Sequence, residues 1–292
     1  MVKGKKAVAS RVRFTDAFPE KKQNLSDYYD DVVILPELAS PKLSATEFYL
    51  KKPDDAHLWN YDYAGKWDER NGRVRPPFKT DSFKDYHPEI RGRKFYWHQK
   101  INKAPGIKLT EADNRKEEFS DRNVAIRPLK KGIKFFFKVY FNDITEDELK
   151  KLMWMLEIGG NKDHAHKIGM GKPIGLGSVQ ISVKGAKIRR IILKDNTIQY
   201  KFEDFPERLQ ITQENYRGEL GCSQKVFKEF MIITNFEKAP QNISYPKNEN
   251  QEENYHWFVA NRQVGIATGT CPVINQPLPL IDKPELTKYK EV

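Results

Sequence analysis

A glycine-rich stretch in the middle of the chain has the residue types needed to bind a polyanion. It runs HKIGMGKPIGLGSVQISV over residues 166–183, and its glycines form two triplets at Gly169, Gly171, Gly175 and Gly177. Glycine has no Cβ, so backbone N–H groups can approach a ligand closely, and successive N–H groups form an anion-binding concavity. Lys167 and Lys172 would add positive charge. The stretch favours contact with a phosphate backbone, and a structural glycine-rich turn is the alternative.

The order of elements around this stretch argues against the common nucleotide-binding motifs. A dinucleotide fingerprint follows a strand and opens a helix. Here a helical pattern precedes the glycines, and a strand-like alternation follows them at residues 178–183. The GK[ST] signature of a P-loop is absent as well.

Two further stretches combine basic residues with aromatic or alternating ones. In RGRKFYWHQ, Arg91, Arg93 and Lys94 precede three aromatic residues, which suits phosphate contact with base stacking. The alternative is an edge strand with its aromatics in the core. In AVASRVRF, Arg11 and Arg13 share one face of a predicted strand, and a sheet with a basic face is a platform for RNA or simply a solvated surface.

Candidate catalytic groups are carboxylates and histidines near these stretches. Asp16 follows the first predicted strand and would hold Mg²⁺ beside a scissile phosphate, or form a simple turn in DAFP. His166 would contact RNA or act as an acid–base group, as would His98, although each is also a common structural histidine. Asp163, His164 and His166 lack the further ligand that a zinc site needs nearby.

The pattern of apolar residues predicts the elements that carry the glycine-rich stretch. Odd positions in 133–141 are apolar, which predicts a half-buried strand. Thr145 and Glu148 form a capping box before an amphipathic helix over 146–157, which Gly159 and Gly160 end. Strand, helix, glycine loop and strand make one βαβ unit, half of a ferredoxin-like sandwich. We therefore expect an α+β fold with a ferredoxin-like (RRM-like) core.

The remainder of the chain predicts additions to this core. Residues 35–127 are rich in proline and lack periodicity, which indicates inserted loops and hairpins. Residues 189–202 predict two strands around an Asp195–Asn196 turn, Ser223 caps a short helix, and 271–286 is an extended proline-rich tail. We expect an RNA-binding domain over residues 1–200 and a C-terminal extension over 201–292 that packs on the core or on a partner.

The composition and net charge of the chain limit the kinds of partner that it can bind and the cell compartment that it suits. The 292 residues include 51 Lys and Arg against 40 Asp and Glu, a net charge of +11 that favours a polyanionic partner. No run approaches the roughly 18 apolar residues of a membrane span, and the N-terminus lacks the apolar core of a secretory signal. Cys222 and Cys271 are the only cysteines, which excludes a disulfide scaffold and fits a reducing cytoplasm.

At these motifs the chain resembles the RAMP superfamily of CRISPR proteins, whose ferredoxin-like folds end in a glycine-rich loop. More narrowly, RVRFTDA, SPKLSATEFYL, RGRKFYWHQ and HKIGMGKPIGLGSV are similar, in this order over residues 8–190, to the type III RAMP family of Cas-seven-type backbone subunits. The resemblance assigns guide-RNA contact to the four loop glycines and Lys172, with Lys167 flanking. The loop is shorter than usual and no GSSLRG-like segment is found, so we expect another chain to supply that part or a split or truncated subunit.

The resemblance implies a guide-RNA-binding subunit of a type III antiviral complex, with CRISPR RNA, complementary target RNA and other Cas subunits as partners and no membrane contact. Family members that cut target RNA use one loop aspartate with a divalent metal, which makes Asp16 with Mg²⁺ the candidate here. The alternative is an endoribonuclease, either of this metal-dependent kind or a metal-independent guide-processing enzyme that uses His98 or His166.

Overall fold

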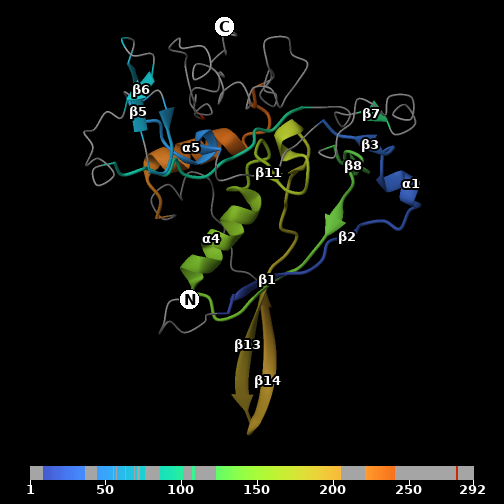
Figure 1. Ribbon diagram of the computed structural model, residues 1–292. Coiled ribbons are helices and arrows are strands. Elements are labelled where there is room, and N and C mark those ends of the chain that lie inside the picture. The colour runs from blue at the N-terminus through green and yellow to red at the C-terminus, as the bar shows by residue number, and fades with distance from the viewer. Residues whose placement is uncertain are drawn as a thin grey trace. The chain divides into compact units, whose positions relative to one another are not determined.

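The computed structural model describes residues 9–36, 45–54, 56, 58–62, 64–68, 70, 73–75, 86–100, 107–108, 123–204, 221–240 and 281. The chain forms two compact units. Unit 1 comprises Met1–Asp31, Arg127–His166 and Ser178–Glu237, and unit 2 comprises Val32–Ile126, Lys167–Gly177 and Lys238–Val292. Both contain small antiparallel sheets and few helices, a mixed composition compatible with the predicted α+β class (Figure 1).

Two short pairs of strands in unit 1 join the start of the chain to its middle. β1 (Val12–Phe14) pairs with β10 (Val139–Phe141), and β2 (Phe18–Pro19) pairs with β9 (Phe135–Phe136). Between these ladders, three residues at 15–17 face two at 137–138, which is the geometry of a β-bulge. The single strand predicted over 133–141 is therefore divided. Its odd positions are still less exposed than their even neighbours, as predicted.

Helix α4 (Glu146–Glu157) begins and ends where the sequence predicts. The Thr145 hydroxyl accepts a hydrogen bond from Glu148 N, and the Glu148 carboxylate accepts one from Thr145 N at 2.8 Å. The helix ends in a left-handed turn at Ile158, with Gly159 and Gly160 also at positive φ. These contacts are a capping box and a glycine-rich stop.

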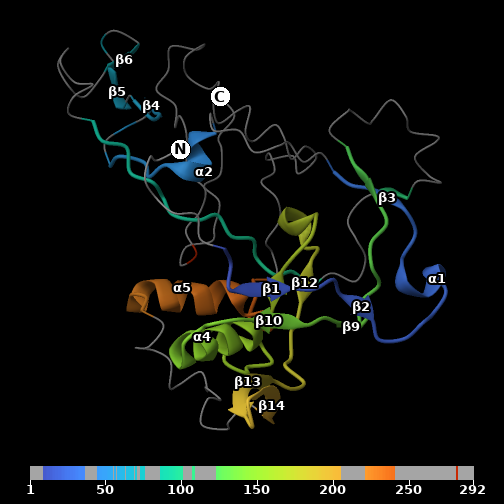
Figure 2. The same cartoon turned by 90° about the horizontal axis from the view of Figure 1, so that it is seen from below.

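Helix α5 (Gln224–Thr234) packs on α4 and forms the core of unit 1 (Figure 2). The Ser223 hydroxyl accepts from Val226 N, which confirms the predicted cap. The core side chains come from both helices: Trp154 and Ile158 of the α4 segment, and Phe227, Phe230 and Met231 of α5. The Trp154 ring lies 5.9 Å and 6.1 Å from the two phenylalanine rings, which are normal separations for aromatic pairs.

A long hairpin projects from the rest of unit 1 (Figure 1). Its strands are β13 (Lys187–Lys194) and β14 (Thr197–Asp204), in the register that pairs Lys194 with Thr197. Asp195 and Asn196 both have positive φ, as a two-residue type I′ turn requires. The predicted hairpin is confirmed, and each strand extends beyond the predicted ends.

Unit 2 has two three-stranded sheets. β3 (Val33–Ile34) lies between β7 (Ile107–Lys108) and β8 (Ala125–Ile126), and β5 (Ala64–Asp68) lies between β4 (Leu58–Trp59) and β6 (Arg73–Arg75). One apolar cluster contains Leu50, Ala56, Trp59 and Ala64. The other contains Val33, Leu35 and Ile174, so the glycine-rich stretch contributes to the core of unit 2.

The remaining elements are short. They are α1 (Leu25–Tyr28), α2 (Thr46–Tyr49), β11 (His166–Lys167), the 3-10 helix η3 (Lys172–Ile174) and β12 (Ser178–Val179). The strand predicted over 178–183 ends at Val179, and Val183 N instead donates to the Glu157 carboxylate at 2.7 Å. The ferredoxin-like arrangement and the boundary at residue 200 stay predictions, and the tail at 271–286 lies outside the described residues apart from position 281.

Candidate nucleic-acid interface

The glycine-rich loop is held in one shape by hydrogen bonds between its own residues. β11 and β12 pair at its two ends, and Ile168 N donates to Gly177 O at 2.8 Å. Gly171 O accepts from Ile174 N and from Leu176 N, both at 3.1 Å. The loop therefore folds back across η3 and is an ordered structure in its own right.

Three of the four loop glycines are required by packing inside the chain. A Cβ on Gly177 would overlap the backbone oxygen of Ile168, and one on Gly171 would lie 2.5 Å from Cδ1 of Leu176. A Cβ on Gly175 would lie 2.8 Å from Oε1 of Gln99. All have φ between +67° and +96°, a region that disfavours other residues. At these positions glycine lets the loop close on itself, so packing alone accounts for it.

Gly169 differs from the other loop glycines because its missing Cβ would face open space. It is exposed between Ile168 and Met170, whose side chains are 56% and 66% exposed. Within the described part of the chain, the N–H groups of residues 169–172 donate no hydrogen bond. Buried or constrained N–H groups normally have a partner, and successive free ones form an anion-binding nest.

The two lysines of the loop have different environments. Lys167 Nζ donates to Gly175 O at 3.0 Å and to Leu176 O at 2.8 Å. Burial, and secondarily the charge of Lys172, lowers the pKa of Lys167 to about 8. Lys172 is half-buried, and among the described residues its ammonium has no hydrogen-bond or ion-pair partner. Lys172 is thus the cation available to a ligand.

The segment predicted as a second contact adjoins the loop within unit 2, because Gln99 lies against Gly175. Arg91 is half-buried and donates from Nη1 to Glu47 O at 3.1 Å. Burial also lowers the pKa of Arg91. Arg93 is exposed, as is Lys94, whose ammonium lies 4.1 Å from the Phe48 ring centre. The exposed cations of this segment are therefore Arg93 and Lys94.

Its aromatic residues are partly available for stacking, but its histidine is buried. Phe95 is 49% exposed, and Tyr96 and Trp97 are half-buried. His98 is only 1% exposed. A buried imidazole cannot reach a phosphodiester without rearrangement, so this conformation gives no support to acid–base chemistry at His98.

Both histidines before the loop make structural hydrogen bonds in unit 1. His166 Nε2 lies 3.0 Å from Leu156 O, and because a carbonyl only accepts, this nitrogen carries the proton. The bond satisfies a free carbonyl at the end of α4. His164 is buried and donates from Nδ1 to the Thr234 hydroxyl at 2.9 Å, since that hydroxyl already donates to Phe230 O. Burial lowers the pKa of His164, opposed by Asp163.

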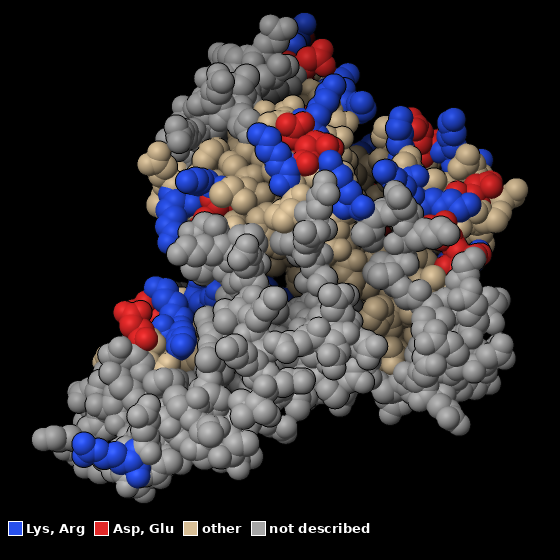
Figure 3. All heavy atoms as spheres, turned by 90° about the horizontal axis from the view of Figure 1, so that it is seen from above, with Lys and Arg blue, Asp and Glu red and all other residues tan. Residues whose placement is uncertain are grey.

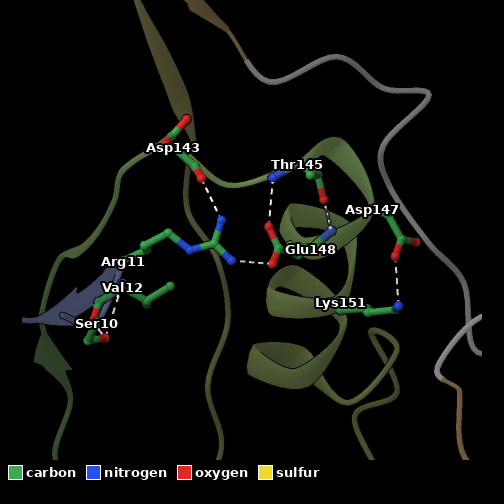
Figure 4. Close-up of polar contacts among 8 residues, drawn as sticks. All are labelled: Ser10, Arg11, Val12, Asp143, Thr145, Asp147, Glu148 and Lys151. Carbon is green, nitrogen blue, oxygen red and sulfur yellow. Dashed lines mark hydrogen bonds and ion pairs between the residues drawn. The ribbon is translucent and has the colours of Figure 1, made fainter. Parts of the chain in front are cut away.

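The two arginines of the first predicted strand have separate surroundings in unit 1, and only Arg13 lies in β1. Arg11 donates to Asp143 O at 2.6 Å and forms an ion pair with Glu148 (Figure 4). Arg13 is exposed and stands opposite Tyr140, which is 53% exposed. Lys138 is exposed beside Thr15 on the same face. Arg13, Lys138 and Tyr140 form a basic–aromatic face.

The sequence patterns did not single out Lys138 and Tyr140 as candidate RNA contacts. The available signal was their even position in the 133–141 strand, which alternates with the apolar odd positions.

On the surface drawn in Figure 3, described basic side chains lie among acidic ones.

Asp16 lies in the bulge between β1 and β2 and is exposed. Bulges often re-aim a side chain near a functional site. In the described ranges, no group of three or more His, Cys, Asp or Glu side chains is arranged to hold a metal. Of the nearby acidic residues, Asp27 caps α1 by accepting from Asn24 N. Among the described residues, Asp16 therefore belongs to no such group.

The family comparison identifies the class of protein. A family model described as the RAMP superfamily matches residues 3–180, which include β1, the basic segment at 91–99, α4 and the whole glycine loop. The chain belongs to the RAMP superfamily. This membership supports a CRISPR-associated role in RNA binding or processing. A search of curated proteins found no match. Among the described residues, no helix is long and apolar enough to cross a membrane.

Proposed function

We propose that this chain binds the guide RNA as a Cas-seven-type backbone subunit of a type III CRISPR complex, with complementary target RNA and other Cas subunits as its partners. The proposal is carried by the N–H groups of residues 169–172 and the ammonium of Lys172, which have no hydrogen-bond or ion-pair partner among the residues that the structure describes. A phosphate would accept hydrogen bonds from these N–H groups and pair with the ammonium.

Other surfaces in the two units support RNA as the ligand. In unit 2, Arg93, Lys94 and Phe95 are exposed on the segment that adjoins the loop. In unit 1, Arg13 and Lys138 flank the exposed ring of Tyr140. Cations beside exposed aromatic rings suit single-stranded nucleic acid, because the cations pair with backbone phosphates while the rings stack on the bases.

The test is the affinity for labelled single-stranded RNA across a range of salt concentrations. Lys172→Ala should weaken binding several-fold and reduce the slope of log affinity against log salt by about 0.7, the loss of one phosphate contact. Lys228→Ala is a matched control, since this lysine is exposed on α5 and removes the same charge. Equal effects of both substitutions would refute a phosphate contact at Lys172.

Metal-dependent cleavage is the alternative function, and the position of Asp16 in the bulge favours it over the histidine route. Mg²⁺ bound there would stabilise charge on a scissile phosphate. In the assembled complex, this function requires cleavage that EDTA abolishes and that Asp16→Asn removes, with guide binding and thermal stability retained. Cleavage that survives both treatments would eliminate Asp16. No cleavage at all would leave the chain an RNA-binding subunit.

A further inference from the structure

Lys167 lies at the start of the glycine loop, and its side chain spans the loop. Its ammonium donates to the carbonyls of Gly175 and Leu176, which lie eight and nine residues later, at 3.0 and 2.8 Å. The next residue, Ile168, donates its N–H to Gly177 O at 2.8 Å. Three consecutive carbonyls of the returning limb are thus bound by two consecutive residues of the outgoing limb.

These bonds fix the part of the loop on which the free N–H groups depend. Leu176 N donates to Gly171 O, so the limb held by Lys167 is in turn bonded to the centre of the 169–172 segment. Ile174 of the same limb is buried against Val33 and Leu35. Moving Gly175 and Leu176 would therefore displace Gly171 as well.

The same contacts restrict what Lys167 can offer to RNA. An ammonium has three donors, and two of those of Lys167 are directed at carbonyls inside the loop. Its side chain is half-buried, whereas Lys172 has no pairing partner in the described part of the chain. Lys167 thus holds the shape of the loop, and Lys172 is the lysine available to the ligand.

We propose that Lys167 is a positioning residue that clamps the two limbs of the loop and makes no phosphate contact of its own. The inference rests on the proposed RNA-binding function of the loop. It differs from the role that the family resemblance implies, in which Lys167 flanks the RNA as a ligand.

The clamp has a pH dependence that follows from its surroundings. Lys167 is partly desolvated, and Lys172 of η3 is the charged group that acts on it among the described residues, so its pKa lies near 8. Above that pH the amine has one donor fewer and no charge, so its bonds to the two carbonyls weaken. Loop order and RNA affinity should therefore decline as pH rises through about 8.

The test compares Lys167→Met, Lys167→Arg and Lys172→Met with the unmodified chain. The first readout is amide hydrogen exchange at Ile168 and Leu176 without RNA, which should be faster in Lys167→Met and restored toward the unmodified rate in Lys167→Arg. The second is affinity for labelled single-stranded RNA against salt. Lys167→Met should weaken binding several-fold with its salt slope unchanged, whereas Lys172→Met should lose about 0.7 of the slope. Above pH 8, the affinity of Lys167→Arg should fall less than that of the unmodified chain.

The outcomes separate this inference from the proposed function. A salt slope reduced equally by Lys167→Met and Lys172→Met would make Lys167 a phosphate ligand and overturn the clamp. Unchanged exchange and affinity in Lys167→Met would overturn it too. An unmodified chain that binds no RNA would refute the proposed function, even if exchange still showed that Lys167 orders the loop.

Discussion

The Arg11 guanidinium pairs with Glu148, the third residue of helix α4, and so ties the edge of strand β1 to the start of that helix (Figure 4). The same carboxylate accepts a hydrogen bond from Thr145 N. The hydrogen bond from Thr145, followed by that from Arg11, lowers the pKa of Glu148. Arg11, which the sequence predicts to face RNA, therefore connects two elements of the fold.

Arg11 and Arg13 should separate stability from RNA binding. We expect Arg13→Met to weaken affinity for single-stranded RNA several-fold with little change in melting temperature, because Arg13 is exposed opposite Tyr140. Arg11→Met should lower the melting temperature and have the smaller effect on affinity. Paired thermal melts and binding titrations measure both, and the reverse order of effects would contradict this division.

Glu148 should contribute to stability at neutral pH and lose that contribution in acid. Its pKa is lower in the folded chain than the usual 4.5, so the unfolded state binds more protons over the interval between the two values. Stability therefore falls as pH drops below about 4.5. Melting temperatures across this range should fall less steeply for Glu148→Gln. A parallel decline in both chains would show that other carboxylates dominate.

The N-cap of α4 provides a test of the helix itself. Thr145→Ala removes the hydroxyl that accepts from Glu148 N and should cost about 0.5–2 kcal/mol of stability. Denaturant unfolding measures this loss, and Thr145→Ser should retain most of the stability because it keeps the hydroxyl. Equal losses in both variants would argue against a capping role.

Gly177 and Gly169 should respond differently to the same substitution. Gly177→Ala places a Cβ on the Ile168 oxygen at positive φ, and we expect the clash to add about 1–3 kcal/mol to a backbone strain of about 1–2 kcal/mol. Gly169→Ala places its Cβ in open space, so only the backbone strain of about 1–2 kcal/mol remains. Urea unfolding of both variants measures the difference, and equal losses would contradict the packing found at Gly177.

His164 should make the fold sensitive to mild acid. Burial lowers its pKa below the usual 6.5, so the unfolded state binds more protons as pH falls past that value, and stability declines. Melting curves from about pH 7.5 to about pH 5.5 should show this decline. His164→Gln should start less stable, since the Thr234 bond is altered, and should vary less with pH. An equal pH dependence in both chains would assign the effect to another group.

Local patterns in the sequence were sufficient to predict several secondary-structure elements. The helix from Glu146 to about residue 157 is predicted because its capping box and its glycine stop lie at the ends of the segment itself. The hairpin turn at Asp195 and Asn196 is likewise local, since both residues adopt positive φ readily. These elements depend on neighbours a few positions apart, which the sequence displays.

Long-range contacts decide the features that the sequence did not predict. The bulge that divides the 133–141 strand depends on its pairing with residues 12–19. The pairing of Arg11 with Glu148 joins positions 137 residues apart. The loop glycines were predicted as access points for a ligand, but only the fold shows that Gly175 faces Gln99 while Gly169 faces open space. Their contacts with RNA stay predictions.

The most direct test of the account is to follow the backbone amides of residues 169–172 by NMR during titration with single-stranded RNA. If these N–H groups bind phosphate, their resonances should move downfield together, with saturation at the affinity measured for the whole chain and with reversal on addition of salt. Amides of Lys228 and its neighbours on α5 serve as the internal control. RNA binding that shifts other amide resonances and leaves those of residues 169–172 unchanged would contradict the central claim that this loop binds the guide RNA.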